Sequence, residues 1–258
     1  GFGPGAGLPG EDSNGADGAG GAGYSTHAAL NRPNDGGTYG SPLLIPLIGG
    51  SGGGGSTTGG GGAGAGAILV ASNTRISVPG RFFANGGSGT GTNGGSGGAV
   101  RLVAPKVEGT GFLQAVGSGF GQNAGDGRFR IDTLDHSDLA LGFQPNNASS
   151  LSIGSLMVAI PAVNPRLDII EAAGTAIPVG SGPVGITLPN GSSTTQNVVV
   201  QATDFEGVVD VDVVVTPENG DRTVYPTTID MGTGNPAQTT VVVEIPLNVG
   251  VKVNCYSR

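Results

Sequence analysis

Apolar and polar residues alternate through much of the carboxyl-terminal part of the chain, and this pattern predicts β-strands. In residues 208–215 the valines at odd positions fall on one face of an extended chain, while Asp210 and Asp212 fall on the other. Val241, Val243 and Ile245 alternate in the same way against Val242 and Glu244. Further strand candidates are residues 167–173, which also suit a short helix, and residues 183–188, 197–203, 222–229 and 249–255.

These strand candidates predict one domain over residues 161–258. Turn sequences rich in Pro, Asn and Gly separate the candidates, for example at residues 189–191, 217–220 and 232–236. About seven short strands in about 100 residues are typical of an immunoglobulin-like β-sandwich. The chain has no Cys pair and no Trp, so nothing supports a true immunoglobulin domain.

The amino-terminal part carries an internal repeat. Residues 66–89 and 98–119 both start with Gly-Ala and an apolar strand, pass a corner marked by Pro or Gly, and continue into a second strand. A shortened third copy begins at Gly127, so the copies start about 30 residues apart. One copy has too few apolar side chains for a core, and stacked copies are the physical solution. The positions expected to face inward are Ile68, Val70, Ile76, Val78 and Phe82 in the first copy and Val100, Leu102, Val107, Phe112 and Val116 in the second.

Glycine separates the two parts sharply. Residues 1–130 hold 41 of the 53 glycines, and no Gly-X-Y period is present, which excludes collagen. Three arrangements could hold so much Gly in order: stacked sheets, polyglycine-type extended helices, or packing against neighbouring chains. We expect the first and the third together, with tight Gly-dependent loops at residues 52–66 and 86–98. The predicted fold is therefore all-β, with a Gly-rich β-solenoid-like repeat domain over 1–145, a linker over 146–160 and the β-sandwich over 161–258.

Composition excludes several classes of function. Eleven Lys and Arg residues face nineteen Asp and Glu residues, so a nucleic-acid partner is not expected. The longest apolar run, residues 43–48, is too short for a membrane span, which needs about 20 residues. A lone Cys255 can form neither an intrachain disulfide nor a thiolate zinc site. We expect no cofactor and no metal.

Candidate catalytic motifs are weak. Residues 89–94 match the glycine pattern of dinucleotide-binding loops, but no helix can follow them. Ser51 and Ser96 lie in Gly-x-Ser-x-Gly patterns within Gly tracts, where such matches arise from composition. Residues 135–138, Asp-His-Ser-Asp, form the densest polar cluster and suit a solvated loop better than an acid–base site. Asp210 and Asp212, with Asp204 and Glu206 nearby, could bind calcium, although the spaced loop of a calcium motif is missing. We predict no catalytic residues and no enzyme activity.

The repeat resembles a known group of proteins. The sequence AILVAS…ANGGSG, followed by GGAVRLVA…GTG…GRFRID, is similar to Gly-rich secreted surface proteins of bacteria, a largely uncharacterised group. The resemblance covers about residues 40–135, and it implies an extracellular, cell-surface location and a structural role. The first residue is Gly rather than Met, as expected of a processed or fragmentary product.

These features predict a self-assembling filament, sheath or matrix subunit whose partner is another copy of the chain. The candidate subunit interface is the apolar run, whose side chains are Leu43, Leu44, Ile45, Leu47 and Ile48. Two accounts of this run stay open: it caps its own repeats near Ile68 and Val70, or it docks on a neighbouring subunit. The alternative function is an adhesin that binds surface glycans, and a β-helix hydrolase comes third because the paired carboxylates of that chemistry are not evident.

Overall fold

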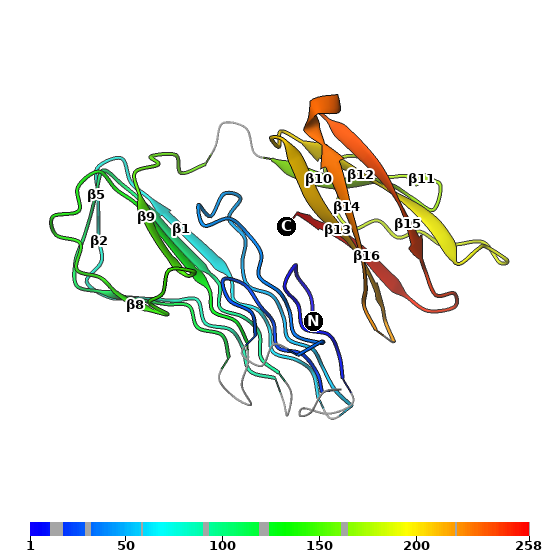
Figure 1. Ribbon diagram of the computed structural model, residues 1–258, viewed down its shortest axis with the longest axis horizontal. Helices are drawn as coiled ribbons and strands as arrows, with labels where there is room; N and C mark the ends of the chain where they lie inside the picture. Colours follow the sequence, from blue (N-terminus) through cyan, green and yellow to red (C-terminus); the bar gives the residue numbers. More distant parts are fainter. Residues whose placement is uncertain are drawn as a thin grey trace. The chain divides into compact units, whose positions relative to one another are not determined.

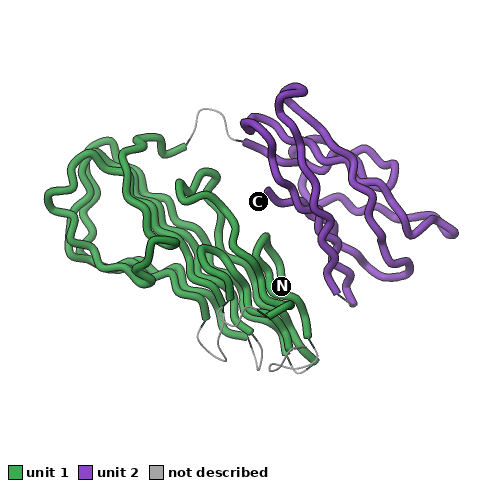
Figure 2. Tube along the Cα trace, in the orientation of Figure 1, with its two compact units in different colours: residues 1–161 green, residues 162–258 purple. Residues whose placement is uncertain are grey.

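The computed structural model is almost entirely β-structure, which confirms the all-β class. It describes residues 1–10, 18–28, 32–57, 59–89, 93–118, 124–160, 165–219 and 221–257. The chain divides into two compact units, Gly1–Pro161 and Ala162–Arg258 (Figures 1 and 2). In the part that the structure describes, no helix is long and apolar enough to cross a membrane.

The strands of the first unit stack in three parallel rows (Figure 1). The first row, in spatial order, is β1 (Ala67–Ala71), β4 (Ala99–Val103), β7 (Arg128–Asp132) and β9 (Leu151–Gly154). The second row is β2 (Arg75–Ser77) and β5 (Lys106–Glu108), and the third is β3 (Arg81–Phe83), β6 (Phe112–Gln114) and β8 (Gly142–Gln144). Every pair in these rows is parallel and in register. Each pass of about 30 residues therefore lies on the one before it, as the internal repeat predicts.

Side chains of matching positions form columns in the core of this unit. Val100, Leu102 and Ile131 are fully buried, and Ile68 and Val70 of the first pass pack against the same cluster. The remaining members of the cluster include Ile76, Val78, Phe82, Val107, Leu113, Ala115 and Phe129.

One strand of the repeat has the opposite facing from the prediction. Leu113 and Ala115 are buried in the core, whereas Phe112 and Val116 are only partly buried and are absent from the core cluster. Phe82 pairs with Leu113, 31 residues later, while Ala67 pairs with Ala99, 32 residues later. The predicted position, Phe112, precedes the true partner of Phe82 by one residue, and neighbouring residues of a strand face opposite sides of the sheet.

The Gly-rich stretches of the first unit run side by side beside the sheets, mostly outside assigned strands (Figure 1). Gly52, Gly53 and Gly54 are consecutive, yet their N–H groups donate to three different segments. The acceptors are, in order, the carbonyl oxygens of Phe2 at 2.8 Å, Gly62 at 2.9 Å and Gly20 at 2.8 Å. A β-strand would bond to two neighbours at most, and an extended helix with three residues per turn reaches more. The hydrogen bonds therefore fit the polyglycine-type arrangement better than stacked sheets.

The second unit consists of two antiparallel sheets that share one hydrophobic core. The first sheet, in spatial order, contains β11 (Thr175–Ala176), β10 (Arg166–Ala172), β12 (Thr195–Thr203) and β15 (Ala237–Glu244). The second contains β14 (Thr223–Asp230), β13 (Val208–Pro217) and β16 (Val251–Ser257), and a short 3-10 helix, η1 (Met231–Thr233), follows β14. The predicted alternation is confirmed: Val209, Val211, Val213 and Val215 are buried in this core, and Val242 is exposed between Val241 and Val243.

Two predicted segments differ in the structure. Residues 146–160, predicted as a linker, lie within the first unit and contain β9, because β9 continues the first row of parallel strands. Residues 183–188, predicted as a strand, form no strand and pair with no other segment. Residues 167–173, which suited either structure, lie mostly within β10.

Candidate functional site

The outer face of the first row of strands carries charged side chains at positions that strand alternation turns away from the core. Val100 and Leu102 of β4 point inward, so Arg101 between them points outward. On β7 the same alternation turns Arg130 and Asp132 outward, beside Arg101. These three side chains are nevertheless buried, with exposed fractions of 1% for Arg101, 10% for Arg130 and 0% for Asp132.

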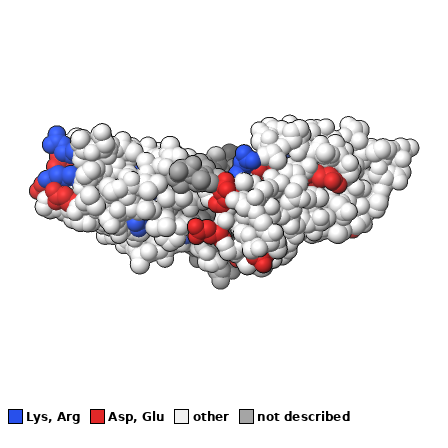
Figure 3. All heavy atoms as spheres, turned by 90° about the horizontal axis from the view of Figure 1, so that it is seen from above, with Lys and Arg blue, Asp and Glu red and all other residues white. Residues whose placement is uncertain are grey.

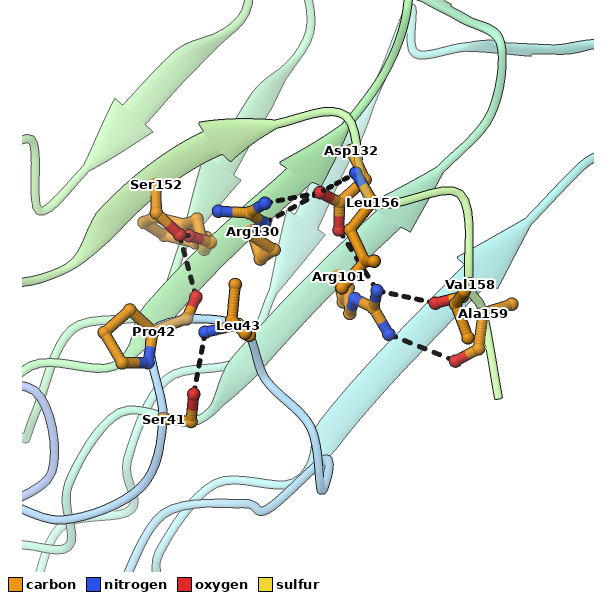
Figure 4. Close-up of polar contacts among 11 residues, drawn as sticks. Ser41, Pro42, Leu43, Arg101, Arg130, Asp132, Ser152, Leu156, Val158 and Ala159 are labelled. Carbon is orange, nitrogen blue, oxygen red and sulfur yellow. Dashed lines mark hydrogen bonds and ion pairs between the residues drawn. The ribbon is translucent and has the colours of Figure 1, made fainter. Parts of the chain in front are cut away.

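The carboxylate of Asp132 is held from three sides (Figure 4). Arg101 Nη2 donates to Oδ2 at 3.1 Å, and Arg130 donates to Oδ1 from Nε at 2.9 Å and from Nη2 at 2.6 Å. The N–H of Leu156 donates to Oδ1 at 3.0 Å. Room for the Arg130 guanidinium exists because residue 154 is Gly, where a Cβ atom would lie 2.2 Å from Nη2. We call Arg101, Arg130 and Asp132 the buried ion cluster.

The electrostatics of the cluster favour the ionised carboxylate. Burial alone would raise the pKa of Asp132, but the hydrogen bonds from Arg130, Arg101 and the N–H of Leu156 together outweigh it. The pKa of Asp132 therefore lies below its ordinary value. With its oxygens bonded and no exposed surface, this carboxylate serves as a structural anchor and is not accessible for acid–base chemistry.

The buried ion cluster fixes a segment of chain on the outer face of the sheet. Arg101 donates from Nη2 to the carbonyl oxygen of Val158 at 2.7 Å and from Nη1 to that of Ala159 at 3.1 Å (Figure 4). A second segment is attached beside it, because Ser152 Oγ on β9 donates to the carbonyl oxygen of Pro42 at 2.8 Å. Residues 41–44 and 155–160, which lie far apart in the sequence of the unit, thus cover the same face.

Several apolar side chains of these two segments point into solvent. The exposed fractions are 43% for Leu43, 36% for Leu156, 39% for Val158 and 70% for Ile160. We call these four side chains the apolar patch. Large exposed apolar side chains on a backbone that cannot fold them inward are typical of interaction surfaces.

The residues of the predicted subunit interface have different environments. Leu43 belongs to the apolar patch, and Ile45 is half-buried. Leu44 is 1% exposed and packs in a cluster with Tyr24, Tyr39 and Ala99, a cluster that Leu47 and Ile48 also contact. Leu44 therefore covers the outer face of the second pass at Ala99 and lies outside the core cluster that contains Ile68 and Val70.

Tyr24 and Tyr39 pack with Leu44 in this cluster. Their rings stack with centroids 4.5 Å apart, and the Arg128 guanidinium lies 5.5 Å from the centroid of the Tyr24 ring. Burial, with a smaller contribution from Tyr39, raises the pKa of Tyr24 well above its ordinary value. The Tyr24 hydroxyl donates to the carbonyl oxygen of Ile48 at 2.8 Å, so both tyrosines are structural.

The serines of the Gly-x-Ser-x-Gly patterns lie within the hydrogen-bonded Gly-rich stretches of the first unit, which we call the Gly-rich array. Ser51 and Ser96 both have exposed fractions of 0%. Ser51 Oγ donates to the Tyr39 hydroxyl at 2.9 Å, and Ser96 Oγ accepts from the Ser51 N–H at 2.8 Å. Their hydroxyls bind backbone and Tyr39 and have no access to a substrate. The glycine pattern at 89–94 includes residues 90–92, which lie outside the described residues.

The polar cluster at residues 135–138 belongs to an exposed charged group. Lys106 Nζ lies 3.5 Å from Asp135 and from Glu108, and it also pairs with Asp138. Figure 3 shows charged side chains of both signs gathered at the end of the first unit that carries β2 and β5. Within the described part of the chain, no group of three or more His, Cys, Asp or Glu side chains is placed to hold a metal ion, and this includes the group near Asp210.

Reasoning from the sequence missed the buried ion cluster and most of the apolar patch. A signal for the cluster exists, because Arg101 interrupts an otherwise apolar strand, and Arg130 and Asp132 alternate with the apolar Phe129 and Ile131. A signal for the patch exists too, in the alternation of Leu156, Val158 and Ile160. No protein-family model, curated protein or solved structure matches the chain.

Proposed function

We propose that the chain is a self-assembling structural subunit of a filament, sheath or matrix at a bacterial cell surface. In this proposal the first unit is a short β-solenoid flanked by a Gly-packed array, and the second unit is an immunoglobulin-like β-sandwich. The three rows of parallel, in-register strands support the first description, and two sheets around a common core support the second. The extracellular location rests on the resemblance of residues 40–135 to Gly-rich secreted surface proteins.

The observation that carries the proposal is the apolar patch on an immobilised backbone. Arg101 and Asp132 hold residues 156–159 by three hydrogen bonds, so the patch cannot turn inward without breaking a buried ion pair. Binding to a fixed surface loses little conformational entropy, because the backbone is already ordered before association. Fully burying one such side chain contributes about 1.5–3 kcal/mol.

The experiment compares assembly of a patch variant with that of the wild type. The variant carries Leu43→Asp and Val158→Asp, both at exposed positions, so circular dichroism should show an unchanged fold. Sedimentation velocity and electron microscopy should show polymer for the wild type and single molecules for the variant.

A matched control keeps the added charge but changes its place. Leu247 of the second unit is 40% exposed, close to the value for Leu43, and Leu247→Asp should leave assembly intact. Normal polymer from the Leu43→Asp, Val158→Asp variant would refute the patch as the assembly surface.

A second candidate function, glycan binding by an adhesin, is favoured by the outer face of β3, β6 and β8. Phe83 is 56% exposed there, and next to it three amides form a ladder across the strands. Asn85 Nδ2 donates to Gln114 Oε1 at 2.9 Å, and Gln114 Nε2 donates to Gln144 Oε1 at 2.6 Å. An exposed aromatic face suits the C–H surface of a sugar ring, and amides both donate to and accept from hydroxyls.

Glycan binding is tested by retention of the protein on insoluble polysaccharides such as cellulose and chitin. We expect Phe83→Ala to release the protein, because the ring offers the main apolar contact. The control is Leu134→Ala, at a side chain that is 63% exposed elsewhere in the unit. Equal retention of Phe83→Ala and the control would contradict this candidate.

A further inference from the structure

The second unit contains a cavity of about 590 Å³ between β10 of one sheet and β16, the edge strand of the other. Its walls are β10 of one sheet, β16 of the other and the segment 177–188. Most of the lining is apolar, including Leu167, Ile169, Ile186 and Ile245. A volume of 300–1,000 Å³ with an apolar lining is typical of binding sites in proteins.

The β16 wall has the period of a β-strand. All residues from 251 to 256 line the cavity. Val251, Val253 and Cys255, at alternate positions, are partly buried and pack against the hydrophobic core, whereas Lys252, Asn254 and Tyr256 add polar groups to the lining. Among the described residues β16 is the last strand of its sheet, with β13 as its paired neighbour. From Val251 to Cys255 this row of side chains is about 13 Å long, at about 3.3 Å per residue.

The third wall of the cavity is loosely packed. Residues 178–185 are exposed, with Val184 at 46%, and a Cβ atom on Gly180, Gly182 or Gly185 would meet no atom within 4 Å. This contrasts with the Gly-rich array of the first unit, where most Cβ atoms would collide with backbone. The segment can therefore move aside for an occupant without losing core contacts.

The chain itself carries an apolar row that matches the cavity. Leu156, Val158 and Ile160 are exposed at alternate positions of a segment that lies outside any strand and bends at residues 159 and 160. No residue from 155 to 160 is charged, which suits a cavity whose lining is mostly apolar.

We propose that the cavity of the second unit binds residues 155–160 of a second copy of the chain, with Leu156, Val158 and Ile160 inserted along β16. The inference rests on the proposed function, and it names the partner surface of the apolar patch. The contact joins two different surfaces, so each molecule offers both a donor segment and an acceptor cavity. Such a heterologous contact generates an open chain of subunits when the rotation does not close a ring.

Cys255 provides a direct readout because it is the single thiol of the chain and lines the cavity. Its alkylation by iodoacetamide at alkaline pH reports whether the cavity is occupied. In the 258-residue chain we expect the alkylation rate to fall as the protein concentration rises and polymer forms. The variant Val184→Asp, at an exposed position of the lining, should abolish both effects, whereas Val242→Asp, 57% exposed and outside the lining, should abolish neither.

A synthetic peptide with the sequence of residues 155–160 and lysines at both ends tests the cavity independently of assembly. At a concentration about ten times its Kd, the peptide should slow alkylation of Cys255 about tenfold and disperse the polymer. The control peptide has Asp at the positions of Leu156, Val158 and Ile160 and should do neither.

The outcomes separate this inference from the proposed function. Polymer whose Cys255 reacts as fast as in the monomer, together with no effect of the peptide, would overturn the inference and leave the proposed function standing. Absence of polymer at every concentration would refute the proposed function, while peptide protection of Cys255 would still support the cavity. Protection that is independent of protein concentration would indicate a contact within one chain and would overturn the inference.

Discussion

The glycines of the two units serve opposite purposes. At Gly95 a Cβ atom would lie 2.0 Å from the carbonyl oxygen of Ala63, so the segments there touch backbone to backbone. None of the described glycines in loops 52–66 and 86–98 has a positive φ, so where Gly is required there, as at Gly95, lack of space rather than backbone conformation requires it. In the second unit Gly174 and Gly191 have a positive φ of 73° and 81° and open space around them, so turn conformation demands Gly.

The first prediction concerns Gly95. We expect Gly95→Ala to lower the free energy of unfolding by about 1–3 kcal/mol, because the Cβ atom forces two hydrogen-bonded segments apart. The control is Gly66→Ala, where no atom lies within 4 Å of the added Cβ. That control should be neutral or stabilising by up to about 1 kcal/mol, through loss of entropy in the unfolded chain. Urea denaturation measures the free energy of unfolding of both variants. Equal stability of the two would mean that the Gly-rich array is loosely packed at Gly95.

The second prediction concerns Asp132 and pH. Asp132→Asn should cost about 3–5 kcal/mol at pH 7, because Arg101 and Arg130 remain buried without their counter-ion. The pKa of Asp132 is lower in the folded chain than in the unfolded one, so its stabilisation is complete above about pH 4. It is lost as the pH falls further, through the lower pKa of the folded state.

Urea denaturation of wild type and Asp132→Asn across pH 7 to pH 2 checks this prediction. The difference in the free energy of unfolding should stay constant down to about pH 4 and shrink below it. A difference that does not change with pH would show that the carboxylate charge contributes nothing to the cluster.

At the scale of elements, each segment that covers the first sheet is held by a few specific buried groups. Residues 41–48 rely on Leu44, whose φ of 51° lies in the left-handed region and costs about 1–2 kcal/mol for a residue with a Cβ atom. The surrounding packing of Tyr24, Tyr39 and Ala99 keeps that conformation. Leu43 next to it has no such role, because it points into solvent.

The third prediction separates these neighbours. Leu44→Ala should lower the free energy of unfolding by about 2–5 kcal/mol, the cost of a cavity between the tyrosines and the sheet. Leu43→Ala should change it by less than about 0.5 kcal/mol and should weaken assembly instead. Thermal unfolding and sedimentation velocity on both variants check the two effects. Destabilisation by Leu43→Ala that equals that of Leu44→Ala would place both side chains in the core.

Local sequence patterns predicted the strands and their buried faces better than the segments that cover the outer face of a sheet. Val209 to Val215 alternate strictly, and a buried face follows directly from that alternation. In the second repeat, the prediction was wrong by one residue, so Phe112 was assigned the place of Leu113, which is the partner of Phe82. The buried ion cluster depends on chain segments about 30 residues apart meeting over one face, and alternation within a strand carries no information on what covers that face.

The structures of residues 146–160 and 183–188 were predicted wrongly because local sequence does not show which strand edges a segment can reach. The first segment is polar in part and resembles a linker, but the open edge of β7 pairs with its β9. The second alternates like a strand, yet in the structure it lines a cavity and joins no sheet. Strand pairing is decided by which edges are available, and the sequence of one segment does not contain that information.

At the scale of the whole molecule, the proposed assembly uses one surface from each of the two units. The first unit offers an apolar patch on a backbone that buried charges hold in place, and the second unit offers an apolar cavity with one movable wall. Only 12% of the residues are charged and the net charge is −8, so repulsion between copies is modest at physiological salt. In this scheme a chain of copies can grow without a cofactor or a second protein.

The central claim, that the chain polymerises through its own surfaces, is tested most directly by sedimentation velocity of the purified wild-type protein over a series of concentrations, with electron microscopy of the same samples. The account predicts a monomer of 25.0 kDa at the lowest concentrations and a growing fraction of larger species that form filaments or sheets at higher ones. A single 25.0-kDa species at every concentration, with no ordered polymer in the micrographs, would contradict it.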